Sequence, residues 1–167
     1  MPLSSVVKNF RDGTIVIKDG TTPTPISMTV QFESGDFSVT GLNESLTEVT
    51  TYLDRGELGT VRKTNRLFPT FSFTAHMTEL SDSSNKTLFD AVNKTAATPW
   101  ASAVSTISGS DVYGLTVELT IEGSNFGGGE TDHVLTMTGC HLALDFAEGD
   151  PNSFTINGTV YGAITAA

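Results

Sequence analysis

The chain has 167 residues, with 19 Asp and Glu against 9 Lys and Arg, which gives a formal net charge of -10 at pH 7. Its hydrophobic fraction of 38%, with 10 Phe, indicates one folded domain over residues 1–167 and argues against a disordered chain. The acidity argues against a nucleic-acid-binding protein, and no apolar run approaches the roughly 18 residues that a membrane span requires.

Strand patterns dominate the first 42 residues. A short β-branched run between glycines, residues 13–20, predicts one strand. Residues 26–42 predict a β-hairpin, because apolar and polar residues alternate on both sides of a turn at 34–36. The apolar positions of this predicted hairpin are Met28, Val30, Phe32, Phe37 and Val39.

A long connection follows, from Leu42 to Leu67, with only weak strand character at residues 46–53. Stretches of this length without clear secondary structure are uncommon inside a compact domain, and they are usually functional or become ordered on binding a partner. The connection is also basic, since residues 55–66 hold four of the nine Lys and Arg against one acid, Glu57. These four bases are Arg55, Arg62, Lys63 and Arg66.

The rest of the chain predicts one helix between strands. Residues 68–77 alternate as a strand, and residues 81–99 read as a helical segment with Asp82 or Ser83 as N-cap and Pro99 as stop. Three further strands are expected at 113–123, 133–148 and 153–164. The order favours a mainly β fold, an antiparallel β-sandwich or barrel with one short α-helix packed on its side.

The polar faces of these strands are rich in Thr and Ser, and no Lys or Arg follows Lys94. Residues 95–167 carry eight acids and no base, so the chain has one positive segment and one wholly negative half. Such a molecule can attract copies of itself. Because lysines that discourage edge pairing are missing here, the strand edges are either covered by the fold or paired with another chain.

No pattern indicates catalysis or metal binding. The three histidines (His76, His133 and His141) lack other ligands at metal spacing, and there is no nucleophile elbow or phosphate-binding loop. We therefore expect no enzyme, no cofactor and no metal. Trp100 and Cys140 are expected in the core, and a single cysteine without a secretory signal fits assembly in a reducing cytoplasm.

The segment order resembles that of the tail tube (major tail) proteins of long-tailed bacteriophages, siphophages in particular. These proteins share a fold with the tube proteins of type VI secretion and contractile injection systems. The resemblance covers roughly residues 5–164 and rests on segment order, size and charge layout. It is carried by the 26–42 segment, the loop TEVTTYLDRGELGTVRKTNRLFP, the helix around TLFDAVNKTA and the terminal ALDFAEGDPNSFTINGTVYGAI.

The resemblance implies stacked, usually hexameric rings around an acidic channel for DNA, with a long loop at about 42–67 reaching the next ring. The expected inter-subunit contacts are Arg55, Arg62, Lys63, Arg66, Tyr52 and Leu58. Glu33, Asp36, Glu118 and Glu122 lie on solvent-facing strand positions and are the candidates for lumen-facing acids. Partners would be the chain itself, tape measure, tail-tip and tail-terminator proteins, and genomic DNA in transit, with no membrane.

Two other functions stay open from the sequence. The same fold could serve as the tube protein of a contractile injection system. From a different class, a carbohydrate- or receptor-binding β-sandwich module, such as a capsid decoration or adhesin domain, would have a similar composition. Such a module normally displays exposed aromatic clusters or a calcium loop, and the sequence shows neither pattern. In the phage interpretation the protein belongs to the virion tail and is assembled in the cytoplasm of the bacterial host.

Overall fold

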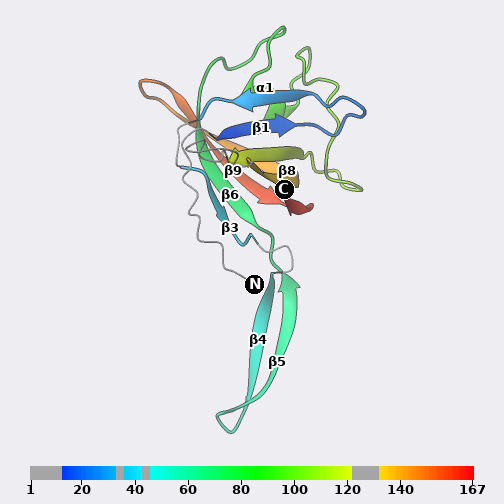
Figure 1. Cartoon of the computed structure of the whole chain (residues 1–167), viewed down its shortest axis with the longest axis vertical. Coiled ribbons are helices and arrows are strands. Elements are labelled where there is room, and N and C mark those ends of the chain that lie inside the picture. The colour runs from blue at the N-terminus through cyan, green and yellow to red at the C-terminus, as the bar shows by residue number, and fades with distance from the viewer. Residues whose placement is uncertain (1–12, 33–35, 43–45, 122–131) are drawn as a thin grey trace.

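The computed structural model describes residues 13–32, 36–42, 46–121 and 132–167. In this part of the chain it is mainly antiparallel β with one short helix, as predicted (Figure 1). The strands are β1 (Thr14–Lys18), β2 (Ser27–Val30), β3 (Ser38–Thr40), β4 (Thr47–Asp54), β5 (Glu57–Arg66), β6 (Thr70–His76), β7 (Leu115–Ile121), β8 (His133–Ala147), β9 (Ser153–Val160) and β10 (Ile164–Ala166), and the helix is α1 (Leu88–Asn93).

Eight strands form one sheet with the order β2-β1-β7-β8-β9-β6-β3, and β10 pairs with β8. The sheet returns on itself, because Phe32, just past β2, bridges Ala75 on β6. Beside this bridge the His76 amide donates to the Gln31 carbonyl at 2.8 Å. The path therefore curves round until the chain just past β2 meets β6.

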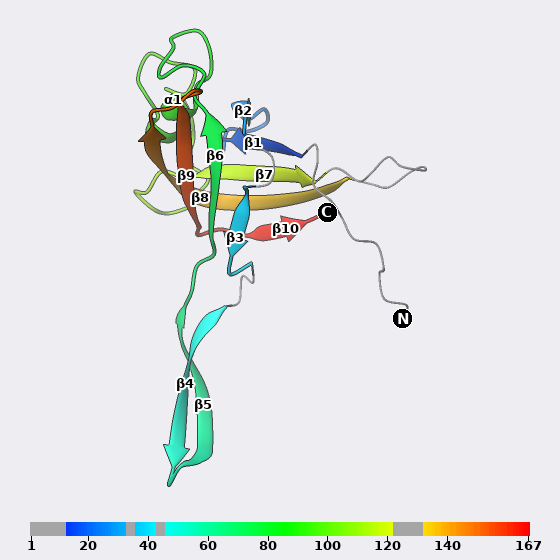
Figure 2. The same cartoon turned by 90° about the vertical axis from the view of Figure 1, so that its left-hand side faces the viewer.

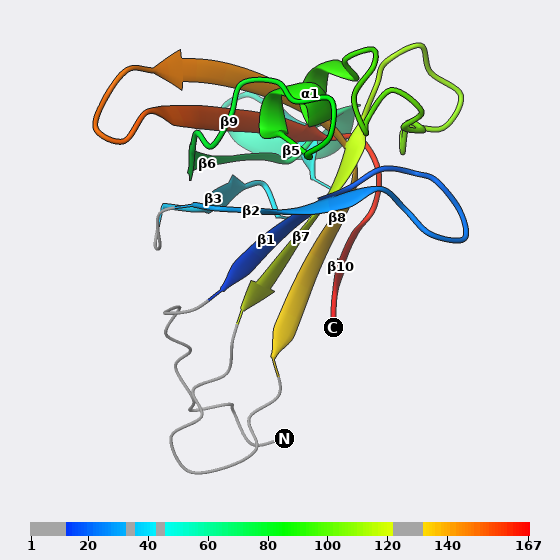
Figure 3. The same cartoon turned by 90° about the horizontal axis from the view of Figure 1, so that it is seen from above.

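The long strand β8 belongs to two parts of this sheet. Residues 133–140 pair with β7, while residues 140–147 pair with β9. At the junction Gly139 has a φ of +63°, a conformation that favours glycine, and the β7 register shifts between Leu115 and Val117. The strand therefore bends, and its two halves run in different directions (Figure 3).

In the strands whose apolar and polar residues alternate, the apolar side chains point into the core, as the sequence predicts. On β6, Phe71, Phe73 and Ala75 are buried, while the residues between them are at least partly exposed. Trp100 and Cys140 are fully buried, which confirms their predicted place in the core.

The helix is shorter than expected and starts later. Its N-cap is Thr87, whose side chain accepts a hydrogen bond from the Asp90 amide, so the predicted caps Asp82 and Ser83 were wrong. Asp82 instead holds the preceding turn, since its carboxylate accepts from the Ser84 amide. Asp90, fully buried, accepts from Ser81 Oγ at 2.8 Å and from the Asp82 amide at 3.0 Å. These bonds fasten the turn to the helix.

The predicted hairpin at 26–42 is wrong. β2 pairs with β1 and β3 pairs with β6, so the two strands lie at opposite ends of the sheet path. Between them Asp36 reaches β6, where its carboxylate accepts from the Thr74 amide at 2.6 Å. Asp36 and residues 38–40 thus follow Phe32 along β6, and β2 and β3 do not pair with each other as a hairpin.

Candidate assembly surfaces

The predicted long connection is a β-hairpin, made of β4 and β5, that stands away from the body of the molecule (Figures 1 and 2). We call residues 47–66 the arm. At its tip Arg55 and Gly56 have φ values of +52° and +86°, so the two-residue turn has the geometry that suits the twist of hairpin strands. With 10 residues in β5, the arm is about 30 Å long at ~3.4 Å per residue.

Large apolar side chains on the arm are exposed. Leu53 and Leu58 form a cross-strand pair beside the tip and are 65% and 64% exposed. Further along, Val49 faces Lys63 and Thr51 faces Val61 on one side of the arm. Tyr52 lies on the other side, and β5 is exposed along its whole length. The arm therefore offers apolar surface that its own chain does not cover.

The four predicted bases of the contact segment lie along this arm in two kinds of environment. Arg62 lies over the ring of Tyr52, 5.8 Å from its centroid, and Arg66 lies over Phe68 at 5.1 Å. Phe68 in turn contacts Tyr161 near the base of the arm. Arg55 at the tip and Lys63 are exposed and make no hydrogen bond or ion pair with another described residue, so their charges are free to meet a partner.

A lone two-stranded hairpin is at best marginally stable in water, and exposed leucines add nothing to its stability. The arm here is held by its ladder, by the bond from Asn65 Nδ2 to Glu48 Oε2 at 2.8 Å, and by the stack at its base. Packing against another molecule would bury its apolar side chains. The arm is therefore the first candidate assembly surface.

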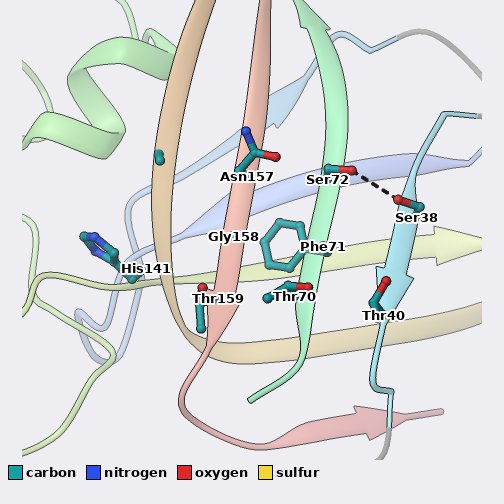
Figure 4. Close-up of a pocket in the computed structure, with 10 residues that line it drawn as sticks. Ser38, Thr40, Thr70, Phe71, Ser72, His141, Asn157, Gly158 and Thr159 are labelled. Carbon is teal, nitrogen blue, oxygen red and sulfur yellow. Dashed lines mark hydrogen bonds between the residues drawn. The ribbon is translucent and has the colours of Figure 1, made fainter. Parts of the chain in front are cut away.

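The second candidate surface is the outward side of the strands β3, β6, β9 and β8. We call it the hydroxyl face, because the side chains that alternate with the core residues here are mostly short and hydroxylated. They are Ser38, Thr40, Thr70, Ser72, Thr74, Thr155, Asn157 and Thr159, with His141, Ala143 and Asp145 on β8. Figure 4 shows the central part, where Ser38 and Ser72 are hydrogen-bonded at 3.1 Å.

The hydroxyl face has no positive charge among its described residues. Its carboxylate, on Asp145, accepts a hydrogen bond from Asn157 Nδ2 at 3.0 Å. The side chains leave an open hollow of about 370 Å³ between β3 and β8. Among the residues described on this face there is no Lys or Arg, and the contact of the His141 ring is to the Tyr113 carbonyl oxygen and not to a hydroxyl group of the face.

The two edges of this four-stranded region are open among the described residues. β3 pairs with β6 on one side only, and the pairing of β8 with β7 ends at Cys140. Residues 141–147 of β8 thus have β9 as their strand partner. Unpaired backbone groups on two opposite edges allow strands of neighbouring copies to continue the sheet.

The predicted lumen acids are not gathered on one surface. Glu118 lies on β7 and forms an ion pair with Lys18 at 2.5 Å, outside the hydroxyl face. Asp36 lies at the edge of β6, bonded to a backbone amide. Glu33 and Glu122 lie outside the described residues. Asp145, which lies on the hydroxyl face, was not among the predicted lumen acids.

Neither a metal centre nor a membrane helix is found in the described part of the chain. No group of three His, Cys, Asp or Glu side chains there could hold a metal ion. His133 and His141 are exposed, and His141 Nδ1 lies 3.2 Å from the Tyr113 carbonyl oxygen. No described helix has the length and hydropathy to cross a membrane.

Comparison with known proteins identifies the fold. No protein-family model matches the chain, and no curated protein matches it in sequence. A chain of the PVC sheath/tube terminator, from an extracellular contractile injection system, matches 99% of this chain and 99% of its own length, with a TM-score of 0.58 and 12% identity. A chain of the PVC sheath-tube complex covers 99% and 93%, with a TM-score of 0.53 and 12% identity.

A third match is to a chain of the anti-feeding prophage baseplate, described as 6-fold symmetrised, with 13% identity and a TM-score of 0.50. It covers 100% of this chain and 97% of that one. At these identities the likeness shows a shared fold. The fold is thus one that occurs in contractile injection particles, over nearly the full length of each chain.

Proposed function

We propose that this protein is a structural subunit that assembles with copies of itself into stacked rings forming a hollow tube. The observation that carries the proposal is the arm, whose leucine pair, Leu53 and Leu58, is about two-thirds exposed on a projecting hairpin. The shared fold supports it, because the matching chains come from assembled particles. Nothing in the proposal needs a cofactor or catalysis.

The hydroxyl face is proposed to line the channel. Continuing the sheet from β3 of one copy to β8 of the next would turn the same face of every copy toward one axis. Six copies, as the resemblance implies, would close such a ring. Duplex DNA carries about one negative charge per 1.7 Å, and a wall without Lys or Arg would not hold it by releasing counterions. The hydroxyl groups would keep the channel wall hydrated.

The acidic residues that we propose for the channel wall therefore differ from those that the sequence predicted. Asp145 would lie in the channel wall and Asp36 at its edge, while the partly neutralised Glu118 would lie elsewhere. Glu33 and Glu122 stay predictions. The channel we propose is thus mainly hydroxyl-lined and weakly acidic, which still lets a polyanion pass without binding.

Two versions of the tube remain candidates. In a siphophage tail the tube would conduct genomic DNA, with tape measure, tail-tip and tail-terminator proteins as partners, and would belong to the virion tail. In a contractile injection system the tube would lie inside a sheath. The fold matches favour the second version, and the channel wall suits both. A glycan-binding module is less well supported, since the hydroxyl face exposes no aromatic cluster.

Self-assembly of the purified protein tests the proposal. We expect rings or tubes in negative-stain micrographs of concentrated wild-type protein, and large species in sedimentation velocity. A Leu53→Ser/Leu58→Ser variant should need at least about tenfold more protein to assemble, since burying one leucine contributes about 1.5–3 kcal/mol and 1.4 kcal/mol is tenfold in affinity.

The matched control is Val112→Ser, which changes an exposed apolar residue far from the arm in sequence. This control should assemble like the wild type. A wild-type protein that stays monomeric at every concentration, with or without a nucleating tail tip, contradicts the proposed function. Monomers that bind a glycan on an array would favour the binding-module alternative.

A further inference from the structure

The arm joins the body of the molecule through a link with little backbone support. The Leu67 amide donates to the Leu46 carbonyl at 2.9 Å, which closes the base of the hairpin. Pro69 is fully buried, and its carbonyl accepts from the Val160 amide at 2.9 Å, so the body begins there. Phe68, between these two points, makes no backbone hydrogen bond with another described residue. Backbone hydrogen bonds at this link therefore do not fix the direction in which the arm leaves the body.

Two side-chain contacts join the arm to the body at this link. The ring of Phe68 lies against the ring of Tyr161, with centroids 5.0 Å apart and planes inclined at 59°. The guanidinium of Arg66 lies over the ring of Phe68, 5.1 Å from its centroid. We call these three residues the base clamp. The base clamp connects the last residue of β5 to the turn that follows β9 (Figure 2).

Tyr161 is held on a firm support. Its amide donates to the Gly139 carbonyl at 3.0 Å, and the next two amides, of Gly162 and Ala163, donate to Thr138 at 3.1 Å and 2.9 Å. Gly162 also approaches β8 closely, because a Cβ there would lie 2.5 Å from the Thr138 carbonyl oxygen. Three successive amides thus fasten this turn to β8, and the ring of Tyr161 can serve as a fixed point for the arm.

The other strand of the arm makes a different kind of contact at the base. A Cβ added at Gly41 would come within 3.3 Å of Leu46 Cδ2, so the Leu46 side chain lies beside the Gly41 backbone. Apolar contact of this kind has no preferred direction, whereas a ring pair and a cation over a ring face do. The base clamp is therefore the directional contact between arm and body in the part of the chain that the structure describes.

We infer that the base clamp fixes the direction of the arm before assembly, with Tyr161 as the positioning residue. Arg66, which the sequence predicts at an inter-subunit contact, then acts within its own chain. The role of the clamp in assembly rests on the proposed function, whereas its effect on the arm is a property of the single chain. An arm that already points in its binding direction loses less conformational freedom when the subunit binds.

The length of the arm magnifies any loss of the clamp. With an arm of about 30 Å, a swing of ~10° at the base moves the tip by ~5 Å, about the spacing between two strands. A tip displaced by that distance misses a site that fits the clamped arm. The apparent affinity of the subunit then falls in proportion to the fraction of chains whose arm points correctly.

Distances between two spin labels on the monomer test the inference. One label is attached at Leu58→Cys near the arm tip and the other at Val112→Cys on the body; both residues are exposed. The native Cys140 takes no label, because it is fully buried and burial raises the pKa of its thiol to about 12. Double electron–electron resonance on the dilute full-length chain then gives the distribution of distances between tip and body.

We expect a narrow distribution in this labelled parent and one at least about twice as wide after Tyr161→Ala, because small swings at the base move the tip by several ångströms. Tyr161→Phe keeps the ring and should keep the narrow distribution. Arg66→Gln should widen it part of the way, and an unchanged width would remove Arg66 from the clamp.

The matched control is Phe146→Ala, which removes an exposed ring beside the start of β9 and should leave the width unchanged. If circular dichroism shows that Tyr161→Ala is unfolded, Tyr161→Leu takes its place, since it keeps apolar volume without the ring. A width equal to that of the parent, in a folded variant without the Tyr161 ring, overturns the inference.

The assembly threshold is the second measurement. Without labels, Tyr161→Ala should need about tenfold more protein than the wild type to form tubes, which corresponds to about 1.4 kcal/mol. Tyr161→Phe should assemble at the wild-type threshold. A wider distance distribution with an unchanged threshold overturns the role of the clamp in assembly. A wild-type protein that never assembles overturns the proposed function, and the distances in the monomer still decide whether the clamp holds the arm.

Discussion

The ring of Phe71 on β6 lies directly over Gly158 on β9, so close that a Cβ at residue 158 would come within 2.2 Å of it. Phe71 also stacks with Phe37 and Phe73. This contact lies on the inner side of the strands whose outer side is the hydroxyl face. The glycine thus lets a bulky aromatic cluster support the proposed channel wall.

We expect Gly158→Ala to destabilise the monomer by about 1–3 kcal/mol, because the methyl group overpacks a rigid ring. Urea unfolding followed by tryptophan fluorescence measures the change, since Trp100 is fully buried. The neighbouring variant Thr159→Ala, on the outer side, should change the free energy of unfolding by less than about 1 kcal/mol. Equal stability of Gly158→Ala and wild type would contradict the packing described.

Acid should weaken the fold through Asp90. Burial alone would raise the pKa of this carboxyl, but hydrogen bonds from the Asp82 amide and Ser81 hold the pKa below the ordinary value of 3.8 for an aspartate. A pKa depressed in the folded state gives stability that is present above pH 3.8 and is lost as the pH falls through the folded pKa. Asp19 acts in the same direction, since hydrogen bonds lower its pKa despite its burial.

Asp90→Asn should therefore be destabilised by about 1–3 kcal/mol at neutral pH, because an amide presents a donor where only acceptors fit. Its free energy of unfolding should also depend less on pH below 3.8 than that of the wild type. Denaturant titrations at several pH values measure both effects. Parallel pH profiles for the two proteins would show that Asp90 is not responsible.

Reversing the charge of the arm should block stacking and spare the fold. Arg62→Glu/Lys63→Glu changes exposed residues, so the free energy of unfolding should move by less than about 0.5 kcal/mol per site. Tube yield, measured by pelleting and micrographs, should drop strongly at low salt. Lys94→Glu reverses a base outside the arm and should assemble normally. A yield equal to wild type from the arm variant would remove these two bases from the interface.

Lysines on the hydroxyl face should make the channel hold DNA. Thr155→Lys/Asn157→Lys introduces two cations per subunit where the described face has none. Tubes of this variant should bind duplex DNA with an affinity that falls steeply as salt rises, because counterions are released on binding. The uncharged variant Thr155→Gln/Asn157→Gln serves as control. If tubes of the lysine variant do not bind duplex DNA at low salt, this face does not line the channel.

Much of the fold could be predicted from alternation alone. Residues such as Phe71 and Phe73 on β6, or Val117 and Leu119 on β7, are buried because side chains in a strand alternate between two faces. The pairing of strands could not be predicted in the same way. Residues 26–42 have the pattern of a hairpin, yet Phe32 and Val39 both lie along β6, since alternation defines a face and not a partner.

The arm shows a second limit of sequence reasoning. Its turn, Arg55-Gly56, is not one of the Asn-Gly or Asp-Gly pairs that signal a tight hairpin, so the two strands read as a loop. The sequence nevertheless predicted where this segment lies in the chain and that it is basic. The hydroxyl face was not identified, because no local pattern indicates that the polar sides of β3, β6, β9 and β8 form one surface.

The most direct measurement of the central claim, that copies of this chain complete one another around a channel, is an electron cryomicroscopy map of the assembled protein. We expect Thr155 and Asn157 to face a central pore and Leu58 to be buried against a neighbouring copy. A map in which the arm extends into solvent, or in which the hydroxyl face lies on the outside of the particle, would contradict the claim.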